Sequence, residues 1–317
     1  MEIVCPGGNG ELVAAALIIG LSNGALIALI ALGYTLVYGI IELINFSHGD
    51  LFMLGTFVAL TVFAALGLVV GTGDTPWLGI LAAGLAAMVF CGILNVLAER
   101  IAYRRLRNAP RLAPLISAIG VSFIYINIGL LWRGPSPIPF PRLLPEIDFV
   151  AAITGADTLI TFTSKDAFVI GTAIPLMLGL AWVIKSTTMG KAMRAVAQDR
   201  EMALQVGIDV NRIISFTFLL GGLLAGAAAL MHGLYNGNTV FTLGFTAGLK
   251  AFTAAVLGGI GNVTGAALGG FLLGILGAMT VTCYGGEWEN VGVFSLLVII
   301  LVFRPTGLLG EHTPDRA

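Results

Sequence analysis

The chain has 317 residues, of which 57% are hydrophobic and only 10% are charged, and its formal net charge is −1. Soluble globular domains carry roughly 25% charged residues, so this chain cannot cover a water-facing surface and is expected to be an integral membrane protein. The balanced charge gives no basis for a nucleic-acid partner. The three cysteines, at positions 5, 91 and 283, lie far apart and fit neither a metal site nor a disulfide pattern.

Eight apolar runs are candidates to cross a membrane as helices, because a hydrocarbon core about 30 Å thick needs roughly 20 helical residues. In chain order they are Leu12–Leu32, Leu51–Val70, Trp77–Ala98, Leu112–Trp132, Ala167–Ile184, Ile213–His232, Thr264–Cys283 and the shorter Val291–Phe303. A ninth, Phe245–Ile260, has 16 residues, so it is either a short span or a re-entrant helix buried in protein. We therefore predict an all-α polytopic bundle of eight or nine membrane helices, formed by residues 1–317 as one domain.

The distribution of basic residues orients the bundle. Lys and Arg are absent before Arg100 and then concentrate in two segments, residues 100–111 and 185–212. Two predicted spans separate these segments, so both lie on one side, which the positive-inside rule makes cytoplasmic. Between them, residues 133–166 hold five prolines from Pro135 to Pro145 and are predicted to form an external loop. If Phe245–Ile260 crosses the membrane, the N-terminus is external and the C-terminus is cytoplasmic. If it re-enters instead, the number of crossings changes by one and this assignment of the termini no longer holds.

Small residues recur at helix-contact spacing. Ala266, Gly270, Gly274 and Ala278 form one stripe, and Gly20 and Gly24 repeat the spacing, as do Gly222 and Gly226. Such stripes let helix backbones approach closely inside a membrane. The string Gly258-Gly259-Ile260-Gly261-Asn262 predicts a tight bend between two membrane helices. The predicted packing glycines of this region are Gly258, Gly259, Gly261, Gly265, Gly270 and Gly274.

The cytoplasmic segment 185–212 is longer than a turn between spans requires. Strong helix formers fill its interior and Gly190 and Gly207 bound it, which predicts one short helix outside the bilayer. That helix is amphipathic, with Met193, Val196, Ala197, Ala203 and Leu204 on its apolar face. It either rests on the membrane surface or docks onto a cytoplasmic partner. Its polar face carries Lys191, Arg194, Gln198, Glu201 and Gln205.

Long strings in the chain resemble the permease subunits of ATP-binding-cassette (ABC) importers. The string MGKAMRAVAQDREMALQVGIDVNR, followed by FLLGGLLAGAAALMHG, is similar to their cytoplasmic coupling segment. Three other strings are similar to regions of branched-chain amino acid permeases of the LivH type. They are GYTLVYGIIELINFSHGDLFMLG, GLKAFTAAVLGGIGNVTGAALGGFLLG and FRPTGLLG. The resemblance runs from about Ser22 to Gly310 and is weakest in the proline-rich external loop.

The resemblance implies a set of partners in a bacterial inner membrane. This chain would form half of a pathway for leucine, isoleucine and valine, beside a second, non-identical permease. A periplasmic or extracellular binding protein would deliver the amino acid, and two cytoplasmic ATPases would grip the coupling segment. The residues expected to couple to them are Gly190, Lys191, Arg194, Gln198, Glu201, Gln205 and Gly207.

The sequence gives no sign of an enzyme. It contains no G-x-x-x-x-G-K-[ST] phosphate loop, so ATP and Mg²⁺ are expected on the ATPase chains and no cofactor or metal on this one. It also lacks the H-E-x-x-H and G-x-S-x-G motifs, so no catalytic residues are predicted.

The string NFSHGD, residues 45–50, places polar groups within apolar surroundings. Ser47 and Asp50 have the spacing of a capping box, which predicts a helix start toward the cytoplasmic side. That does not account for Asn45 and His48. Polar side chains retained in a membrane usually line water or contact a partner. We therefore predict that Asn45, Ser47, His48 and Asp50 lie along the translocation pathway or at its gate.

Two further charges lie in or near predicted spans. Glu42 is expected to be an interfacial carboxylate at a helix end. Lys250 either reaches the outer membrane surface through its flexible side chain, attracts the carboxylate of a zwitterionic cargo on the pathway, or pairs with Asp50 or Glu42.

Two alternatives stay open from the sequence. The same architecture would also serve an importer of urea, amides or other neutral amino acids, since a separate binding protein sets selectivity. A stand-alone secondary transporter is the other alternative. It would need carboxylates in mid-span, and the sequence offers only Glu42 and Asp50, both near an edge.

Overall fold

The computed structural model describes residues 10–68, 76–107, 109–110, 112–155, 159–304 and 306–310. Within them, eight helices are long and apolar enough to cross a membrane, which confirms the predicted all-α polytopic class. They are α1 (Gly10–Ile41), α2 (Ser47–Ala65), α3 (Trp77–Ala98), α4 (Leu112–Arg133), α6 (Ser164–Ser186), α9 (Val210–Asn236), α11 (Val263–Tyr284) and α12 (Glu289–Phe303). A π turn, Glu99–Tyr103, and a 3₁₀ turn, Arg104–Leu106, prolong α3, and a 3₁₀ turn, Gly286–Trp288, precedes α12.

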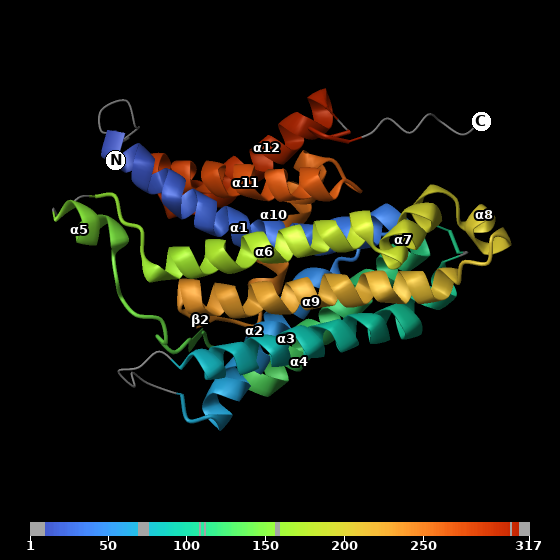
Figure 1. Ribbon diagram of the computed structural model, residues 1–317, viewed down its shortest axis with the longest axis horizontal. Helices are drawn as coiled ribbons and strands as arrows, with labels where there is room; N and C mark the ends of the chain where they lie inside the picture. Colours follow the sequence, from blue (N-terminus) through green and yellow to red (C-terminus); the bar gives the residue numbers. More distant parts are fainter. Residues whose placement is uncertain are drawn as a thin grey trace.

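Four shorter helices and one strand pair complete the described chain (Figure 1). The helices are α5 (Phe149–Thr154), α7 (Thr188–Gln198), α8 (Arg200–Gln205) and α10 (Leu243–Gly258). The strands β1 (Ile138–Pro139) and β2 (Asn238–Thr239) pair antiparallel. Figure 1 shows α5 at one end of the bundle and α7 and α8 at the other.

Several contacts gather at the α8 end of the bundle. Arg200 of α8 hydrogen-bonds the Ile40 carbonyl near the end of α1. Gly39 packs on Gly261, in the turn between α10 and α11. The amides of Leu308 and Leu309, beyond α12, donate to the last carbonyls of α10. The chain beyond α12 therefore lies at the opposite end from the start of α1.

The arrangement of α10 favours a crossing over a re-entrant loop. Its first turns contact Gly49 and Asp50 of α2 in the bundle interior, and its last residue faces Gly265 of α11. It thus carries the chain from the far end of α9 back toward the α8 end. The predicted bend at residues 258–262 is confirmed: α10 ends at Gly258, and Gly259 and Gly261 have φ of 104° and 94°. These values lie in the region that favours glycine.

The proline-rich loop that follows α4, predicted to be external, folds onto the end of α9, and the start of α6 beyond it contacts α1. The Phe140 amide donates to the Gly237 carbonyl at 2.9 Å. Asp166 begins α6 in a capping box with Thr163, and its Oδ1 accepts hydrogen bonds from Ser22 of α1 and Tyr235 of α9. A carboxylate with this many donors fixes the start of α6 and the end of α9 against α1.

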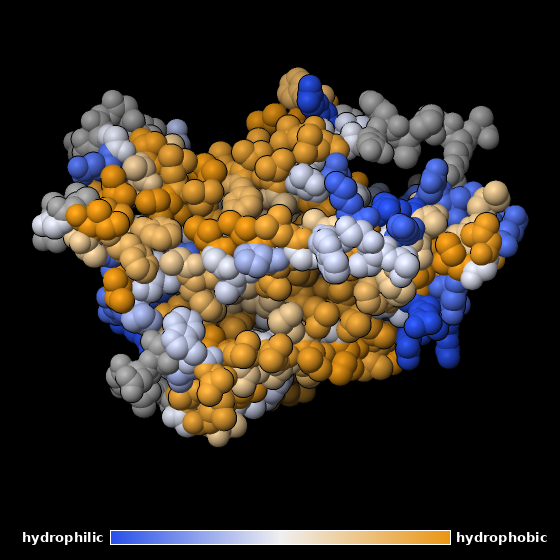
Figure 2. Space-filling view, in the orientation of Figure 1, coloured by the Kyte–Doolittle hydropathy of each residue, from blue (hydrophilic) through white to orange (hydrophobic). Residues whose placement is uncertain are grey.

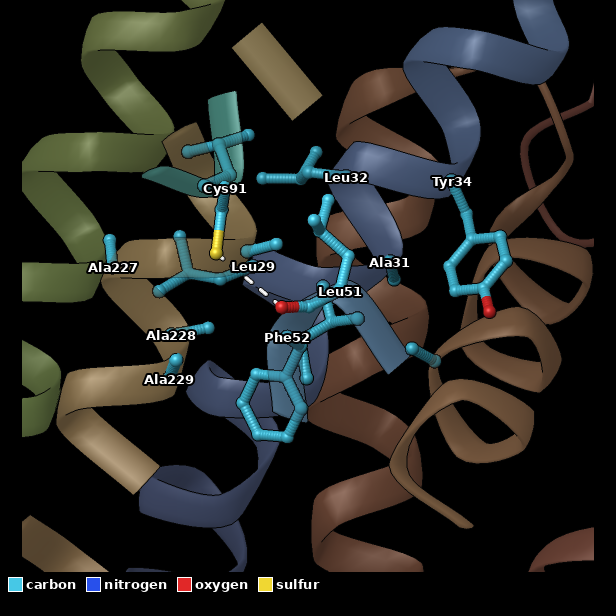
Figure 3. Close-up of a cluster of buried hydrophobic side chains, with 14 of the residues drawn as sticks. Leu29, Ala31, Leu32, Tyr34, Leu51, Phe52, Cys91, Ala227, Ala228 and Ala229 are labelled. Atoms are coloured by element: carbon cyan, nitrogen blue, oxygen red, sulfur yellow. Dashed lines mark hydrogen bonds between the residues drawn. The ribbon is translucent and has the colours of Figure 1, made fainter. Parts of the chain in front are cut away.

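The core lies where α1, α2, α3 and α9 meet. Figure 3 shows Leu29, Leu51 and Phe52 around Cys91, whose thiol donates to the Leu51 carbonyl at 3.4 Å. Figure 2 shows an apolar belt over the flank of the bundle and hydrophilic side chains gathered at the α7–α8 end. Exposed leucine and isoleucine on α3, α4 and α12 fit a surface that contacts lipid or another membrane subunit.

The predicted small-residue stripe is a helix contact. A Cβ added at Gly274 would overlap the backbone of Gly24, and one added at Gly270 would overlap Ala28. Helices α1 and α11 therefore approach with almost no side chain between them, and van der Waals packing holds them together.

We expect Gly274→Val to force α1 and α11 apart. Overpacking of this kind costs about 1–3 kcal/mol, so the purified protein should melt at a clearly lower temperature in detergent. Gly171→Val on α6 is the matched control, because nothing lies within 4 Å of a Cβ at that position. Equal melting temperatures for the two variants would contradict this packing account.

Candidate functional site

Four polar side chains at the start of α2 and on the α3 segment form a buried polar cluster: Asn45, Ser47, Asn95 and Tyr103. Ser47 Oγ and Tyr103 OH both donate to Asn45 Oδ1, at 2.7 and 2.8 Å. Asn45 Nδ2 donates to Asn95 Oδ1 at 3.4 Å, and Asn95 Nδ2 donates to the Phe218 carbonyl of α9 at 2.7 Å. Each residue is 1% exposed or less, so the cluster ties three helices together away from solvent.

The predicted capping box at Ser47 and Asp50 is wrong. Helix α2 follows Phe46 without any side-chain cap, although it begins where the sequence indicated. Ser47 is engaged with Asn45 and Tyr103, and Asp50 accepts a hydrogen bond from Ser122 of α4. In an apolar interior, partners from other helices compete for these side chains, and here they displace the local cap.

His48 and Asp50 are sealed between helices. The His48 ring lies edge-on to Tyr34, with ring centroids 5.0 Å apart, in space that the missing side chain of Gly33 leaves. Asp50 is 1% exposed, and its Oδ1 has no hydrogen-bond partner among the described residues. Close contact of Gly49 with Gly244 and Gly248 of α10 shuts this region. The pathway candidates at the start of α2 thus face other helices in this conformation.

Lys250 pairs with an acid that the sequence analysis did not consider. Its Nζ lies 2.6 Å from Glu289 Oε1, so the predicted pairing with Asp50 or Glu42 is wrong. Glu289 begins α12, two residues before the predicted span, and the sequence pattern places it outside the membrane. Gly277 of α11 packs against the Glu289 side chain. The pair joins α10 to α12 and neutralises a charge that would be costly in lipid.

Segment 185–212, which the sequence predicts to be cytoplasmic, forms two helices rather than the single helix predicted. Asp199 has extended backbone, and its Oδ1 accepts from the amides of Glu201 and Met202 at 2.9 and 3.0 Å. Aspartate favours the N-cap position over the interior of a helix, so the chain ends α7 and begins α8 at Asp199. Gly190 does not bound the helix as predicted: it lies inside α7 against the end of α6, and Thr187 caps α7.

Most of the predicted coupling residues are at the surface. Lys191, Arg194, Gln198, Glu201, Gln205 and Gly207 are exposed, and Gly207 follows α8 with φ of 84° as predicted for a helix end. Arg194 also bonds the Ile184 carbonyl and so ties α7 to α6. On the predicted apolar face, Met193, Val196 and Ala203 are buried, whereas Ala197 and Leu204 are exposed.

Helix α8 ends in an exposed apolar tip. Met202, Leu204 and Val206 are 57%, 58% and 73% exposed. Three neighbouring apolar side chains at the hydrophilic end of the bundle have no packing role inside the chain. Patches of this kind mark contacts with another protein or a membrane.

A cavity of about 1100 Å³ opens between the end of α1, the α1–α2 linker (residues 42–46) and the α7–α8 segment. Glu42, exposed as predicted for an interfacial carboxylate, has φ of 54° and is the only non-glycine residue with positive φ among those described. This conformation costs a residue with a Cβ about 1–2 kcal/mol. Tyr103 of the buried polar cluster lines the cavity as well, so the cavity reaches the cluster.

A buried charge cluster lies beside this cavity and was missed from the sequence. Glu99 is fully buried and accepts from Ser215 at 2.7 Å, from Arg104 at 3.1 Å, and from Arg107. Burial lowers the pKa of Arg107, while the Glu99 charge opposes that shift. The sequence pattern instead places both arginines in a cytoplasmic loop. The spacing from Glu99 to Arg104, which the π turn brings together, is the signal that could have revealed the cluster.

The described residues contain no group of three His, Cys, Asp or Glu side chains placed to hold a metal ion. The chain is a multi-pass helical membrane protein with an apolar flank and a set of polar side chains buried inside the bundle. A family model described as a branched-chain amino acid transport system permease component matches residues 16–303. The chain belongs to this family, whose members are transport subunits of ABC systems rather than enzymes.

Individual relatives agree with the family match. The permease protein BraD of a high-affinity branched-chain amino acid transport system in Pseudomonas aeruginosa is 42% identical, over 95% of this chain and 96% of its own length. The corresponding LivH proteins of Escherichia coli K12 and Salmonella typhimurium are 40% and 39% identical, each over 94% of this chain and 95% of their own length. The similarity thus covers nearly the whole permease.

We expect Glu99→Gln to destabilise the folded permease strongly. Removing one partner of a buried charge pair leaves the other uncompensated, which costs about 3–5 kcal/mol. The control is Glu146→Gln, since Glu146 pairs with Arg142 at the surface, where an ion pair contributes about 0–1 kcal/mol. Thermal unfolding in detergent measures both; a Glu99→Gln melting temperature within the range of the control would refute the structural role of the cluster.

Proposed function

We propose that this chain forms half of the membrane pathway of an ATP-driven importer of leucine, isoleucine and valine. A second, non-identical permease supplies the other half, and two cytoplasmic ATPases bind and hydrolyse ATP with Mg²⁺. A binding protein on the external side delivers the amino acid. The relatives belong to high-affinity branched-chain amino acid transport systems, which supports this cargo.

The proposed orientation places the α7–α8 end in the cytoplasm of a bacterial inner membrane. Arginines gather there, including Arg104 and Arg107 beside α9 and Arg200 on α8. The positive-inside rule favours this side for such residues. The external end carries the loop with α5, where a binding protein would dock, and the C-terminus lies on the cytoplasmic side with the chain beyond α12.

The exposed apolar tip of α8 carries the proposed coupling role. Met202, Leu204 and Val206 project from the cytoplasmic end, beside exposed Glu201 and Gln205. An apolar centre with a polar rim is the usual composition of a protein interface. The alternative, a helix lying on the membrane surface, would bury the same side chains in lipid. If the tip contacts the ATPases, they need it in order to bind to the permease. If α8 instead lies on the membrane surface, their binding does not depend on the tip.

Transport is proposed to proceed by alternating access, with the start of α2 as the inner barrier. Asn45, Ser47, His48 and Asp50 are buried by contacts of α2 with α3, α4 and α10, so a cargo reaches them only when these helices part. Asp50, whose Oδ1 has no hydrogen-bond partner among the described residues, is suited to the ammonium group of an amino acid. Lys250 contributes to the pathway only in a state where Glu289 releases it.

The double variant Leu204→Glu/Val206→Glu tests the coupling role. We expect the permease to insert normally while co-purification of ATPase chains in mild detergent falls at least tenfold, because two carboxylates would be desolvated at an apolar interface. The matched control is Ile153→Glu on α5, a side chain 84% exposed at the opposite end of the bundle.

Unchanged co-purification in the double variant would rule out the α8 tip as the ATPase contact and favour the membrane-surface helix. A wild-type chain that purifies from its native membrane alone would overturn the importer itself and favour a stand-alone secondary transporter. A complex that takes up urea or short amides but not leucine would keep the architecture and change the cargo.

A further inference from the structure

The joint between α8 and α1 has a specific construction. Arg200, the first residue of α8, donates from Nη2 to the Ile40 carbonyl at 2.9 Å. The last carbonyls of a helix lack partners within it, and a cation near them also favours the helix dipole. Arg200 therefore caps α1 from a different cytoplasmic element. Asp199 caps α8 immediately before Arg200.

A second feature stops α1 at the same place. The Glu42 amide donates to the Tyr38 carbonyl at 2.8 Å, and Glu42 holds the left-handed conformation that ends many helices. Glycine or asparagine usually takes this position, so a glutamate there is held by its surroundings. The end of α1 is thus defined by a backbone turn and by the guanidinium of α8 together.

The α1–α2 linker connects this joint directly to the buried polar cluster. Only two residues, Leu43 and Ile44, separate Glu42 from Asn45, whose Oδ1 accepts from both Ser47 and Tyr103. Any displacement of the end of α1 therefore reaches Asn45 through a very short covalent path. The cavity beside the linker, lined by Glu42, Ile44, Tyr103 and Arg200, leaves room for such a displacement.

Helices α7 and α8 are attached to the bundle in different ways, although α7 also packs against α1 and α9. Helix α7 is fixed to the end of α6 by Arg194, which bonds the Ile184 carbonyl, and by close contact of Gly190 with the same carbonyl. Helix α8 instead reaches α1 through Arg200. The break at Asp199 separates the helix that packs on α6 from the helix that carries Arg200.

We propose that Arg200 is a positioning residue that transmits movement of α8 to the inner barrier of the pathway. When α8 moves, Arg200 carries the end of α1 and the α1–α2 linker with it, and the hydrogen bonds of Asn45 with Ser47 and Tyr103 rearrange. The start of α2 then separates from α3 and opens the pathway to the cytoplasm. This inference rests on the proposed function, because it needs ATPases that act on α8.

The test uses the complete transporter, reconstituted in proteoliposomes with its second permease, ATPases and binding protein. The readout is the number of leucine molecules taken up per ATP hydrolysed. For Arg200→Gln we expect ATP hydrolysis within about twofold of wild type and uptake at least tenfold lower, so the ratio falls. Arg200→Lys, which keeps a cationic donor for the Ile40 carbonyl, should recover most of the ratio. Arg105→Gln, on an exposed arginine of the same face, is the control and should leave the ratio unchanged.

A second pair of variants tests the linker without touching Arg200. Glu42→Gly keeps the left-handed turn without strain and should preserve the ratio. Glu42→Val, whose branched side chain opposes that turn, should lower it as Arg200→Gln does. An Arg200→Gln transporter with a wild-type ratio, or one that loses hydrolysis and uptake equally, would overturn the inference. Failure of the wild-type chains to assemble would instead overturn the proposed function, so the two failures are distinguishable.

Discussion

The requirement that polar groups be satisfied inside the bundle shapes the interior of this permease. Lipid offers no hydrogen bonds, so a helix that starts within the bundle, as α2 does, needs partners from its neighbours. Asn45 and Ser47 find them in Asn95 and Tyr103, and Glu99 finds them in two arginines and Ser215. These two clusters lie along the same α3 segment. They join the interior of the bundle to the α7–α8 end, which is the end proposed to contact the ATPases.

Close helix contacts and polar clusters have complementary roles in this arrangement. Glycines bring α1 and α11 together over several turns and make a rigid pair. The contact of α2 with α10 through Gly49, Gly244 and Gly248 extends over fewer residues and lies beside Asp50 Oδ1, which has no hydrogen-bond partner among the described residues. This contrast supports the proposal that α2 and α10, rather than α1 and α11, separate during transport.

Features that depend on local pattern and composition could be predicted from the sequence. Hydrophobicity predicted the membrane helices, and the spacing of small residues predicted the α10–α11 bend and the glycine contacts. All of these are present in the structure. The predictions of a capping box, of an unbroken coupling helix and of the partner of Lys250 were wrong. In each case another side chain forms an interaction that the local sequence pattern does not show. Asp199 prefers to cap α8, and Glu289 reaches Lys250 only in the folded bundle. Tyr103, Asn95 and Glu99 were missed because a helical pattern does not show which polar residues turn inward.

The start of α2 is proposed to form an inner barrier that opens with the ATPase cycle. The most direct measurement is thiol labelling of a Ser47→Cys variant from the cytoplasmic side, with the native cysteines replaced and the transporter held with or without ATP. We predict that the introduced thiol reacts in one nucleotide state and is protected in the other, because Ser47 is fully buried in the closed conformation. Equal protection in every state, in a transporter that still takes up leucine, would contradict the account.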